Sequence, residues 1–467
     1  MLEGDGTSKN LAYGWLLMAV LSLVFAGVFA MLVASARTPG IEDLLPLGRD
    51  HIFVALVGHV VLAVVIWFLA FEGFLWIYTT TCVINHRVYS PFAGWVSIGL
   101  CSIGVALVVV SAVFGLGSAE LANYVPVLLT PYFYAGLIFF AAGILINLVN
   151  MFLTVARAKA QGATLPTVTF GMVTAGVAVF AAFSCFALSG YYQVATGKAF
   201  FDFERLFWGG GHILQFANTI AMVTVWMYLA YLIYGKEPIG SGKAKLLYAF
   251  YLLFIIPAPF LYFIYDTADS GYKDAFTFLM RWGLGPSTSV LALSVVYLLL
   301  TGDRVSFKKP GFSSLVLSML IFLTGGVLAL MIKGVNTIIP AHYHCVIGAV
   351  TIAFMGLFYE ILPAFKREIY SKKMAAVQPY LYFAGILLFA VGLYIAGSHG
   401  VARKTYGGAQ NLNSMGKFVG MAIMGLGGVV SILGGITFVV NAIATLLKKE
   451  NATVAVYDSE MAPLGKH

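Results

Sequence analysis

Residues 337–362 read TIIPAHYHCVIGAVTIAFMGLFYEIL, and this stretch decides how the rest of the sequence is interpreted. It is apolar and long enough to cross a bilayer as a helix, which needs roughly 20 residues. It nevertheless carries His342 and His344, and ionisable groups inside a membrane span are costly and indicate function. Residues two apart on an α-helix are separated by about 200° of rotation, so the two imidazoles should point to opposite faces. One helix could then ligate two different centres, whereas a single ion could not be chelated by both side chains.

The remainder of the 467-residue chain has the composition of a membrane protein, with 61% hydrophobic and 10% charged residues. A soluble chain is usually about 45–50% apolar and about 25% charged, so a soluble enzyme, a disordered protein and a nucleic-acid binder are excluded. Apolar runs bounded by charge, Pro or Gly predict twelve membrane spans, near 12–35, 51–81, 92–116, 126–155, 167–190, 204–234, 245–266, 276–301, 312–333, 337–362, 378–398 and 417–447. We therefore expect an all-α integral membrane protein with about twelve transmembrane helices, in which residues 1–449 form the membrane domain and 450–467 a cytoplasmic tail.

The distribution of Lys and Arg predicts the orientation of these spans. With the N-terminus in the cytoplasm, 17 of the 27 basic residues fall on the cytoplasmic side, as the positive-inside rule requires. An even number of spans then places both termini in the cytoplasm, in a multi-pass protein of the cell inner (cytoplasmic) membrane surrounded by membrane lipid. The formal net charge of +8 is thus a topology signal, and no nucleic-acid partner is expected.

Histidines on three of the predicted spans share one depth. His59, His212 and His342 each lie eight or nine residues from the outer start of their span, which is roughly 12 Å into the membrane. A single intramembrane histidine is more often a hydrogen-bonded packing residue. A layer of imidazoles together with the H-x-H instead favours ligands of a buried metal or haem.

Two motifs resemble the catalytic subunit of the haem-copper oxidase superfamily, which includes oxygen reductases and nitric oxide reductases. Ala341-His342-Tyr343-His344 is similar to that family's A-H-x-H, and Trp208-Gly209-Gly210-Gly211-His212 resembles the W-x-x-G-H that opens its sixth helix. The twelve spans also match that subunit, so the resemblance covers nearly the whole chain and implies a subunit I-like fold.

The resemblance implies roles for individual residues. His342 would be the proximal ligand of a high-spin haem, while His344 and His59 would be the two ligands of a low-spin haem. The stretch Gly400-Val401-Ala402-Arg403-Lys404 resembles the basic motif that binds haem propionates. Arg403 and Lys404 would then pair with those carboxylates. The alternative for this pair is a solvated loop.

The sequence departs from the family at the second metal site, where the resemblance makes His212 a ligand. The family's seventh helix carries two adjacent histidines, but the predicted span 245–266 has none, so a copper ion held by three histidines cannot form. A mixed set of His212 with Asp266 or a tyrosine such as Tyr262 would suit non-haem iron, which accepts nitrogen and oxygen ligands. An empty site, with Asp266 a plain loop acid, is the alternative.

Together these features predict a haem-binding respiratory membrane subunit that passes electrons from the low-spin to the high-spin haem. It would be a divergent nitric oxide reductase-like, or oxygen reductase-like, oxidoreductase acting on a small gas. Electrons would come from an electron-donor subunit or protein, a c-type cytochrome or a cupredoxin, because the sequence holds neither a C-x-x-C-H motif nor a cupredoxin ligand set. The cofactors implied are two haems and at most one non-haem iron, without copper. A non-catalytic electron-transfer subunit and a transporter with structural histidines are the alternatives.

Overall fold

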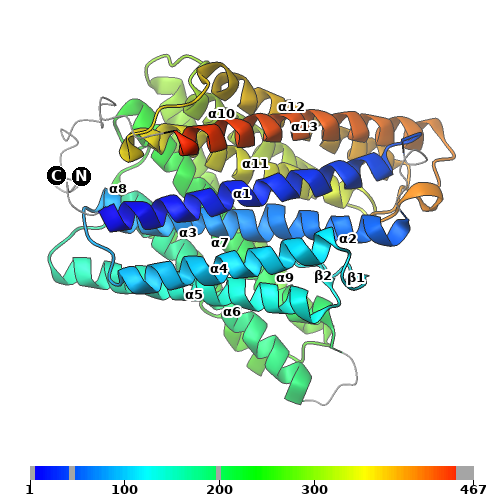
Figure 1. Ribbon diagram of the computed structural model, residues 1–467, viewed down its shortest axis with the longest axis horizontal. Helices are drawn as coiled ribbons and strands as arrows, with labels where there is room; N and C mark the ends of the chain where they lie inside the picture. The colour runs from blue at the N-terminus through cyan, green and yellow to red at the C-terminus, as the bar shows by residue number, and fades with distance from the viewer. Residues whose placement is uncertain (1–5, 42–47, 196–200, 449–467) are drawn as a thin grey trace. The chain divides into compact units, whose positions relative to one another are not determined.

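The computed structural model describes residues 6–41, 48–195 and 201–448 (Figure 1). Within these residues twelve helices are long and apolar enough to cross a membrane, which confirms the all-α fold class and the predicted number of spans. The predicted tail, 450–467, lies outside the described residues. The elements are α1 (Gly6–Arg37), α2 (Arg49–Val60), α3 (Trp67–Ile77), α4 (Pro91–Val113), β1 (Ala119–Glu120), β2 (Val127–Leu128), α5 (Pro131–Ala160), α6 (Thr167–Ala195), α7 (Phe203–Tyr234), α8 (Ser241–Ile255), α9 (Ser270–Thr301), α10 (Pro310–Leu330), α11 (Ile338–Ile361), α12 (Lys372–Ser398) and α13 (Met415–Leu447).

The second span is one continuous helical segment, Asp50–Val83, that contains two π-helical turns. A π-helical turn, Val61–Ile66, joins α2 to α3, and a second one, Tyr78–Val83, ends the span. His59 lies two residues before the first of these turns. Such π-helical turns are rare in proteins, and many of those known lie at functional sites. The irregular turn beside His59 is therefore consistent with its predicted role as a ligand.

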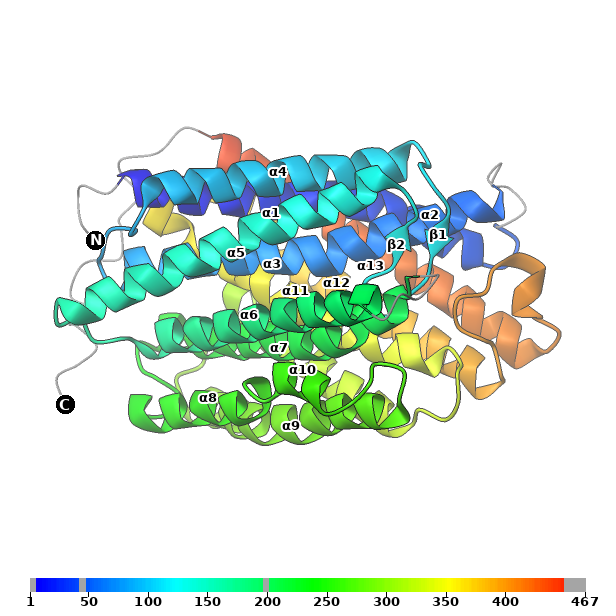
Figure 2. The same ribbon diagram turned by 90° about the horizontal axis from the view of Figure 1, so that it is seen from below.

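The described residues form two compact units. The first holds the start of α1, the helices α3 to α9 and the β1–β2 hairpin, in residues 6–19, 65–195 and 201–303. The second holds the rest of α1 with α2 and α10 to α13, in residues 20–41, 48–64 and 304–448. In the first unit α4 packs on α5 and α6 on α7, and Figure 2 shows the hairpin at the ends of α4 and α5, which it connects.

In the second unit, glycines spaced seven residues apart bring α12 and α13 close together. A Cβ added at Gly385 or Gly392 of α12 would lie 2.1–2.2 Å from a backbone nitrogen of α13. One added at Gly427 of α13 would lie 2.2 Å from the backbone nitrogen of Phe389. Small residues at the interface are how helices associate in lipid, where apolar burial gives no driving force between them. This close packing on α13 holds α12 in position, and α12 also packs against α11, the helix that carries the H-x-H.

The seventh span is interrupted near its C-terminal end. The helix α8 ends at Ile255, and the chain continues as a 3-10 helix, Ala258–Phe263. Pro257 and Pro259 cause this change because neither has an N–H group to donate to the preceding turn. The next helix, α9, begins at Ser270, earlier than the predicted start at residue 276, because polar residues continue the helix beyond its apolar run.

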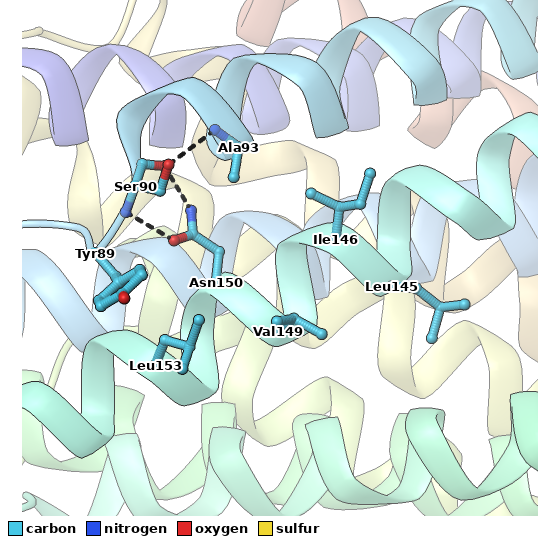
Figure 3. Close-up of a pocket in the computed structure, with 8 residues that line it drawn as sticks. All are labelled: Tyr89, Ser90, Ala93, Leu145, Ile146, Val149, Asn150 and Leu153. Carbon is cyan, nitrogen blue, oxygen red and sulfur yellow. Dashed lines mark hydrogen bonds between the residues drawn. The ribbon is translucent and has the colours of Figure 1, made fainter.

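A cavity of about 330 Å³ lies between the start of α4 and the middle of α5. Its walls are mostly apolar, and Figure 3 shows Asn150 pointing at the Ser90 backbone at one end. The Asn150 amide accepts a hydrogen bond from the Ser90 N–H and donates one to the Ser90 carbonyl, both at 3.0 Å. The Ser90 hydroxyl in turn accepts from the Ala93 N–H and caps α4. None of the predicted ligands lines this cavity, so it lies outside the candidate site.

Candidate functional site

Two of the predicted haem ligands, His59 and His344, lie in the same unit with their ring nitrogens arranged alike. Nδ1 of His59 donates to the Ala26 carbonyl of α1 at 3.1 Å, and Nδ1 of His344 donates to the Pro340 carbonyl at 2.7 Å. Because a carbonyl only accepts, each Nδ1 carries the proton and each Nε2 keeps its lone pair. The two rings are close enough to interact electrostatically. This tautomer and orientation are what a metal-bound imidazole requires.

The other histidine of the H-x-H, His342, points to a different neighbour. Its Nδ1 donates to the Gly325 carbonyl of α10 at 2.8 Å, whereas the His344 ring packs on Phe389 of α12 with centroids 4.7 Å apart. The two side chains thus leave α11 toward different helices, as the two-residue spacing predicts. His342 also keeps its Nε2 lone pair for a ligand.

Sequence reasoning missed a buried cation in this unit, Arg37, at the end of α1. Its side chain is only 9% exposed, and its Nε and Nη2 have no hydrogen-bond partner among the described residues. The guanidinium lies over the Tyr406 ring, 5.9 Å from the centroid, and interacts electrostatically with Tyr343 and His344. Among the described residues no carboxylate pairs with this buried guanidinium, and such burial is costly, so its Nε and Nη2 groups suit an anionic partner. In the sequence, Arg37 resembles any cation that ends a membrane span.

The predicted basic loop lies against the start of α11. Ala402 forms a β-bridge with Asn336, and the Thr337 N–H donates to the Val401 carbonyl at 3.1 Å, so the loop is tied to the residues that precede the H-x-H. Arg403 interacts electrostatically with Tyr343, which stands between the two histidines. Burial raises the pKa of Tyr406, three residues beyond Arg403, to about 12, so its phenol is neutral.

These residues fit a haem. His59 and His344 would each offer an Nε2 lone pair as a nitrogen ligand, and the Arg37 guanidinium, whose Nε and Nη2 lack a partner among the described residues, would suit carboxylates together with Arg403 and Lys404. All five lie in one unit.

His212 belongs to the other unit and is held by two hydrogen bonds. Its Nδ1 donates to the Trp208 carbonyl at 2.8 Å, so its Nε2 accepts from the Tyr124 hydroxyl at 3.1 Å. The two residues predicted to share its site have other partners. The Tyr262 hydroxyl bonds the Tyr272 hydroxyl at 2.9 Å, and the exposed Asp266 carboxylate accepts from the Ala268 N–H at 2.8 Å. The catalytic grouping of His212, Tyr262 and Asp266 stays a prediction, and the partner that the structure gives His212 is Tyr124.

A copper ion does not fit the described residues. No group of three or more His, Cys, Asp or Glu side chains in the described ranges is placed to hold a metal ion. The span Ser241–Phe263 contains no histidine that could complete a set with His212. The side-chain donors that the described residues place there, the His212 imidazole and the Tyr124 phenol, hold copper poorly.

Three consecutive glycines of α7 make room for the aromatic rings around His212. A Cβ on Gly209 would meet the Tyr262 hydroxyl and the Phe276 ring, one on Gly210 the Phe186 ring, and one on Gly211 the Tyr124 ring at 2.3 Å. The triple glycine of the W-x-x-G-H motif is therefore a packing requirement of this site. It lets Tyr124 approach α7 one residue before His212.

Comparison with known proteins supports the same fold and family. A solved haem-copper terminal oxidase dimer matches with a TM-score of 0.80 over 98% of this chain and 89% of that chain, at 18% identity. Similar relatives are an uncharacterised protein of Aquifex aeolicus, 28% identical over 80% of this chain and 89% of the relative, and one of Rickettsia prowazekii, 26% identical over 92% and 95%. The Thermus thermophilus cytochrome c oxidase subunit 1 is 26% identical over 53% of this chain and 48% of that protein.

The family model described as cytochrome c and quinol oxidase polypeptide I matches residues 10–430. The match covers nearly all of the twelve-helix region, including both histidine motifs. This multi-pass membrane protein therefore belongs to the cytochrome c and quinol oxidase polypeptide I family, the haem-binding subunit I family of the haem-copper respiratory oxidases.

Proposed function

We propose that the chain is a respiratory oxidoreductase subunit that holds two haems and transfers electrons from one to the other. His59 and His344 would hold the low-spin haem and His342 the high-spin haem. The observation that carries the proposal is the pair His59 and His344, each with its proton on Nδ1 and its lone pair on Nε2, in a unit that also buries Arg37, whose Nε and Nη2 have no partner among the described residues. When bound, the haem irons supply one-electron transfer and an open position for a small gas.

The side chains of the unit perform three tasks in this proposal. The Nδ1–carbonyl bonds of the histidines fix the ring orientation and raise the basicity of each ligand nitrogen. The haem carboxylates would be neutralised by Arg37, Arg403 and Lys404. The two arginines suit this task best, because a planar guanidinium donates two parallel hydrogen bonds to one carboxylate. The single helix α11 supplies a ligand to each centre and so places the two side by side.

The substrate that we propose is a small gas, nitric oxide or oxygen, handled by a divergent, nitric oxide reductase-like enzyme. Without three histidines at the second site, a copper-dependent reaction does not suit this chain, and a non-haem iron at His212 is the alternative to a site without metal. Electrons would come from a c-type cytochrome or a cupredoxin partner. The protein would lie in the lipid of the cell inner membrane with both termini in the cytoplasm, because 17 of its 27 basic residues then face inward.

The purified, dithionite-reduced chain tests this proposal. We expect carbon monoxide to bind one of the two haems, and the reduced protein to consume nitric oxide or oxygen when an artificial donor supplies electrons. His342→Ala should lose both properties. His399→Ala is the matched control, because the Nδ1 of this exposed histidine likewise donates to a backbone carbonyl, that of Ile395. A haem-free protein, or carbon monoxide binding that survives in His342→Ala, would overturn the proposal.

A second candidate function is a haem-bearing electron-transfer subunit without catalysis. The hydrogen bond from Tyr124 favours it, because Nε2 of His212 is already engaged. This candidate predicts two haems, neither of which binds carbon monoxide, so the same difference spectrum separates the two functions.

A further inference from the structure

The loop that carries Tyr124 is clamped to the helix that carries His212. Glu204, in the first turn of α7, accepts hydrogen bonds from the Asn123 backbone N–H and from the Asn123 side-chain amide, both at 2.6 Å. The loop belongs to the β1–β2 hairpin, whose strands pair Ala119 with Leu128 and Glu120 with Val127. Both ends of the loop are therefore fixed, and α7 itself holds the residue next to Tyr124.

Tyr124 has a backbone conformation that tyrosine rarely adopts. Its φ is 68°, in the left-handed region that disfavours residues with a Cβ. Strain of this kind persists only where the surrounding structure imposes it, and it is concentrated at functional sites. Here it turns the phenol toward α7, where Gly211 makes room for the ring and the hydroxyl reaches Nε2 of His212. The two ring centroids are 5.0 Å apart.

We propose that Tyr124 is a positioning residue whose phenol occupies, on His212, the position that a metal ion would need. The Tyr124 hydroxyl uses the Nε2 lone pair, and Nδ1 is bound to the Trp208 carbonyl, so both nitrogens of the ring are engaged. A metal ion binds an imidazole at about 2.0–2.1 Å along the same lone pair, so the phenol and a metal ion cannot both use Nε2 in this arrangement. His212 is thus a fixed, neutral imidazole held by a loop.

The surroundings of His212 support a site built for the pair rather than for an ion. The ring stands among Trp208, Tyr124 and Phe276, with centroids 4.8, 5.0 and 6.3 Å away. These three neighbours are aromatic and uncharged, and the carboxylate that interacts electrostatically with His212, that of Glu204, is engaged by the two hydrogen bonds from Asn123. The pairing of Tyr124 with His212 stands on these contacts alone.

Nuclear magnetic resonance of the full chain labelled with ¹⁵N-histidine tests the proposal, with the His212 signals assigned by their loss in His212→Ala. Tyr124→Phe keeps the ring beside Gly211 and removes only the hydroxyl. We expect it to shift the Nε2 resonance of His212. Tyr132→Phe, which removes an exposed phenol at the start of α5, should leave the resonance unchanged. An unchanged Nε2 resonance in Tyr124→Phe would overturn the proposal.

A second variant and a second measurement keep the test independent of haem. Glu204→Gln retains the phenol but weakens the loop clamp, so we expect a smaller shift in the same direction. The wild type and His212→Ala should also retain equal copper after exposure to excess Cu²⁺ and desalting. One copper ion per chain that the wild type keeps and His212→Ala loses would contradict the proposal. Neither the histidine resonance nor copper retention depends on haem. A haem-free chain would therefore refute the proposed function, but the pairing of Tyr124 with His212 could still be tested.

Discussion

Replacing Arg37 with methionine should weaken haem retention without harming the apoprotein. The guanidinium is buried, and two of its N–H groups, on Nε and Nη2, have no partner in the described chain. A hydrogen bond to a charged group contributes about 1.5–3 kcal/mol, so the loss of one to a haem carboxylate should lower haem affinity by about 10- to 150-fold. In the apoprotein the same change removes a buried charge that no described carboxylate balances, so stability should be unchanged or raised.

Haem titration and thermal unfolding of the apoprotein measure the two halves of this prediction. Arg281→Met is the matched control, because Arg281 is an exposed arginine of α9, in the other unit, and its replacement should leave both quantities unchanged. The reasoning is refuted if Arg37→Met binds haem as tightly as the wild type. It is equally refuted if the apoprotein of that variant unfolds at a clearly lower temperature, because Arg37 would then support the fold itself.

His59→Ala and His344→Ala should each abolish the same low-spin haem signal, because the two lie in one unit with their rings in electrostatic contact; loss of different haems in the two variants would disprove the pairing. His342→Ala should remove only the haem that binds carbon monoxide, since its side chain leaves α11 toward α10 rather than α12. Simultaneous loss of both haems from a folded variant would count against this. Element analysis of the purified protein should find no copper, and stoichiometric copper would show that the ligand count at His212 is wrong.

The spans and the histidine geometry could be predicted because both follow from local periodicity. Apolar length predicts twelve spans, and the two-residue spacing of His342 and His344 predicts different faces. The ends of the helices are harder to predict from the sequence. Hydropathy marks only the part of a helix that lies in lipid, so it predicts that α9 starts at residue 276, whereas polar residues extend the helix back to Ser270.

The partners that tie the candidate ligands to other segments could not be predicted because they are distant in the sequence. Tyr124 is 88 residues from His212, and its approach depends on a hairpin with two-residue strands and on a strained backbone that no pattern of apolar residues encodes. Gly211, directly before His212, is part of a recognisable sequence motif, but only the structure shows that it makes room for the Tyr124 ring. The role of Arg37 could not be predicted for a different reason, because a basic residue at the end of a membrane span is also expected from membrane topology alone.

The account depends most on one claim, that α11 serves two haems while α2 supplies the second ligand of one of them. The most direct measurement is the haem content of the purified wild type together with its low-temperature electron paramagnetic resonance spectrum in the oxidised state. The account predicts two haems per chain, one low-spin with two imidazole ligands and one high-spin. A single haem per chain, or two haems without a bis-imidazole low-spin signal, would contradict it.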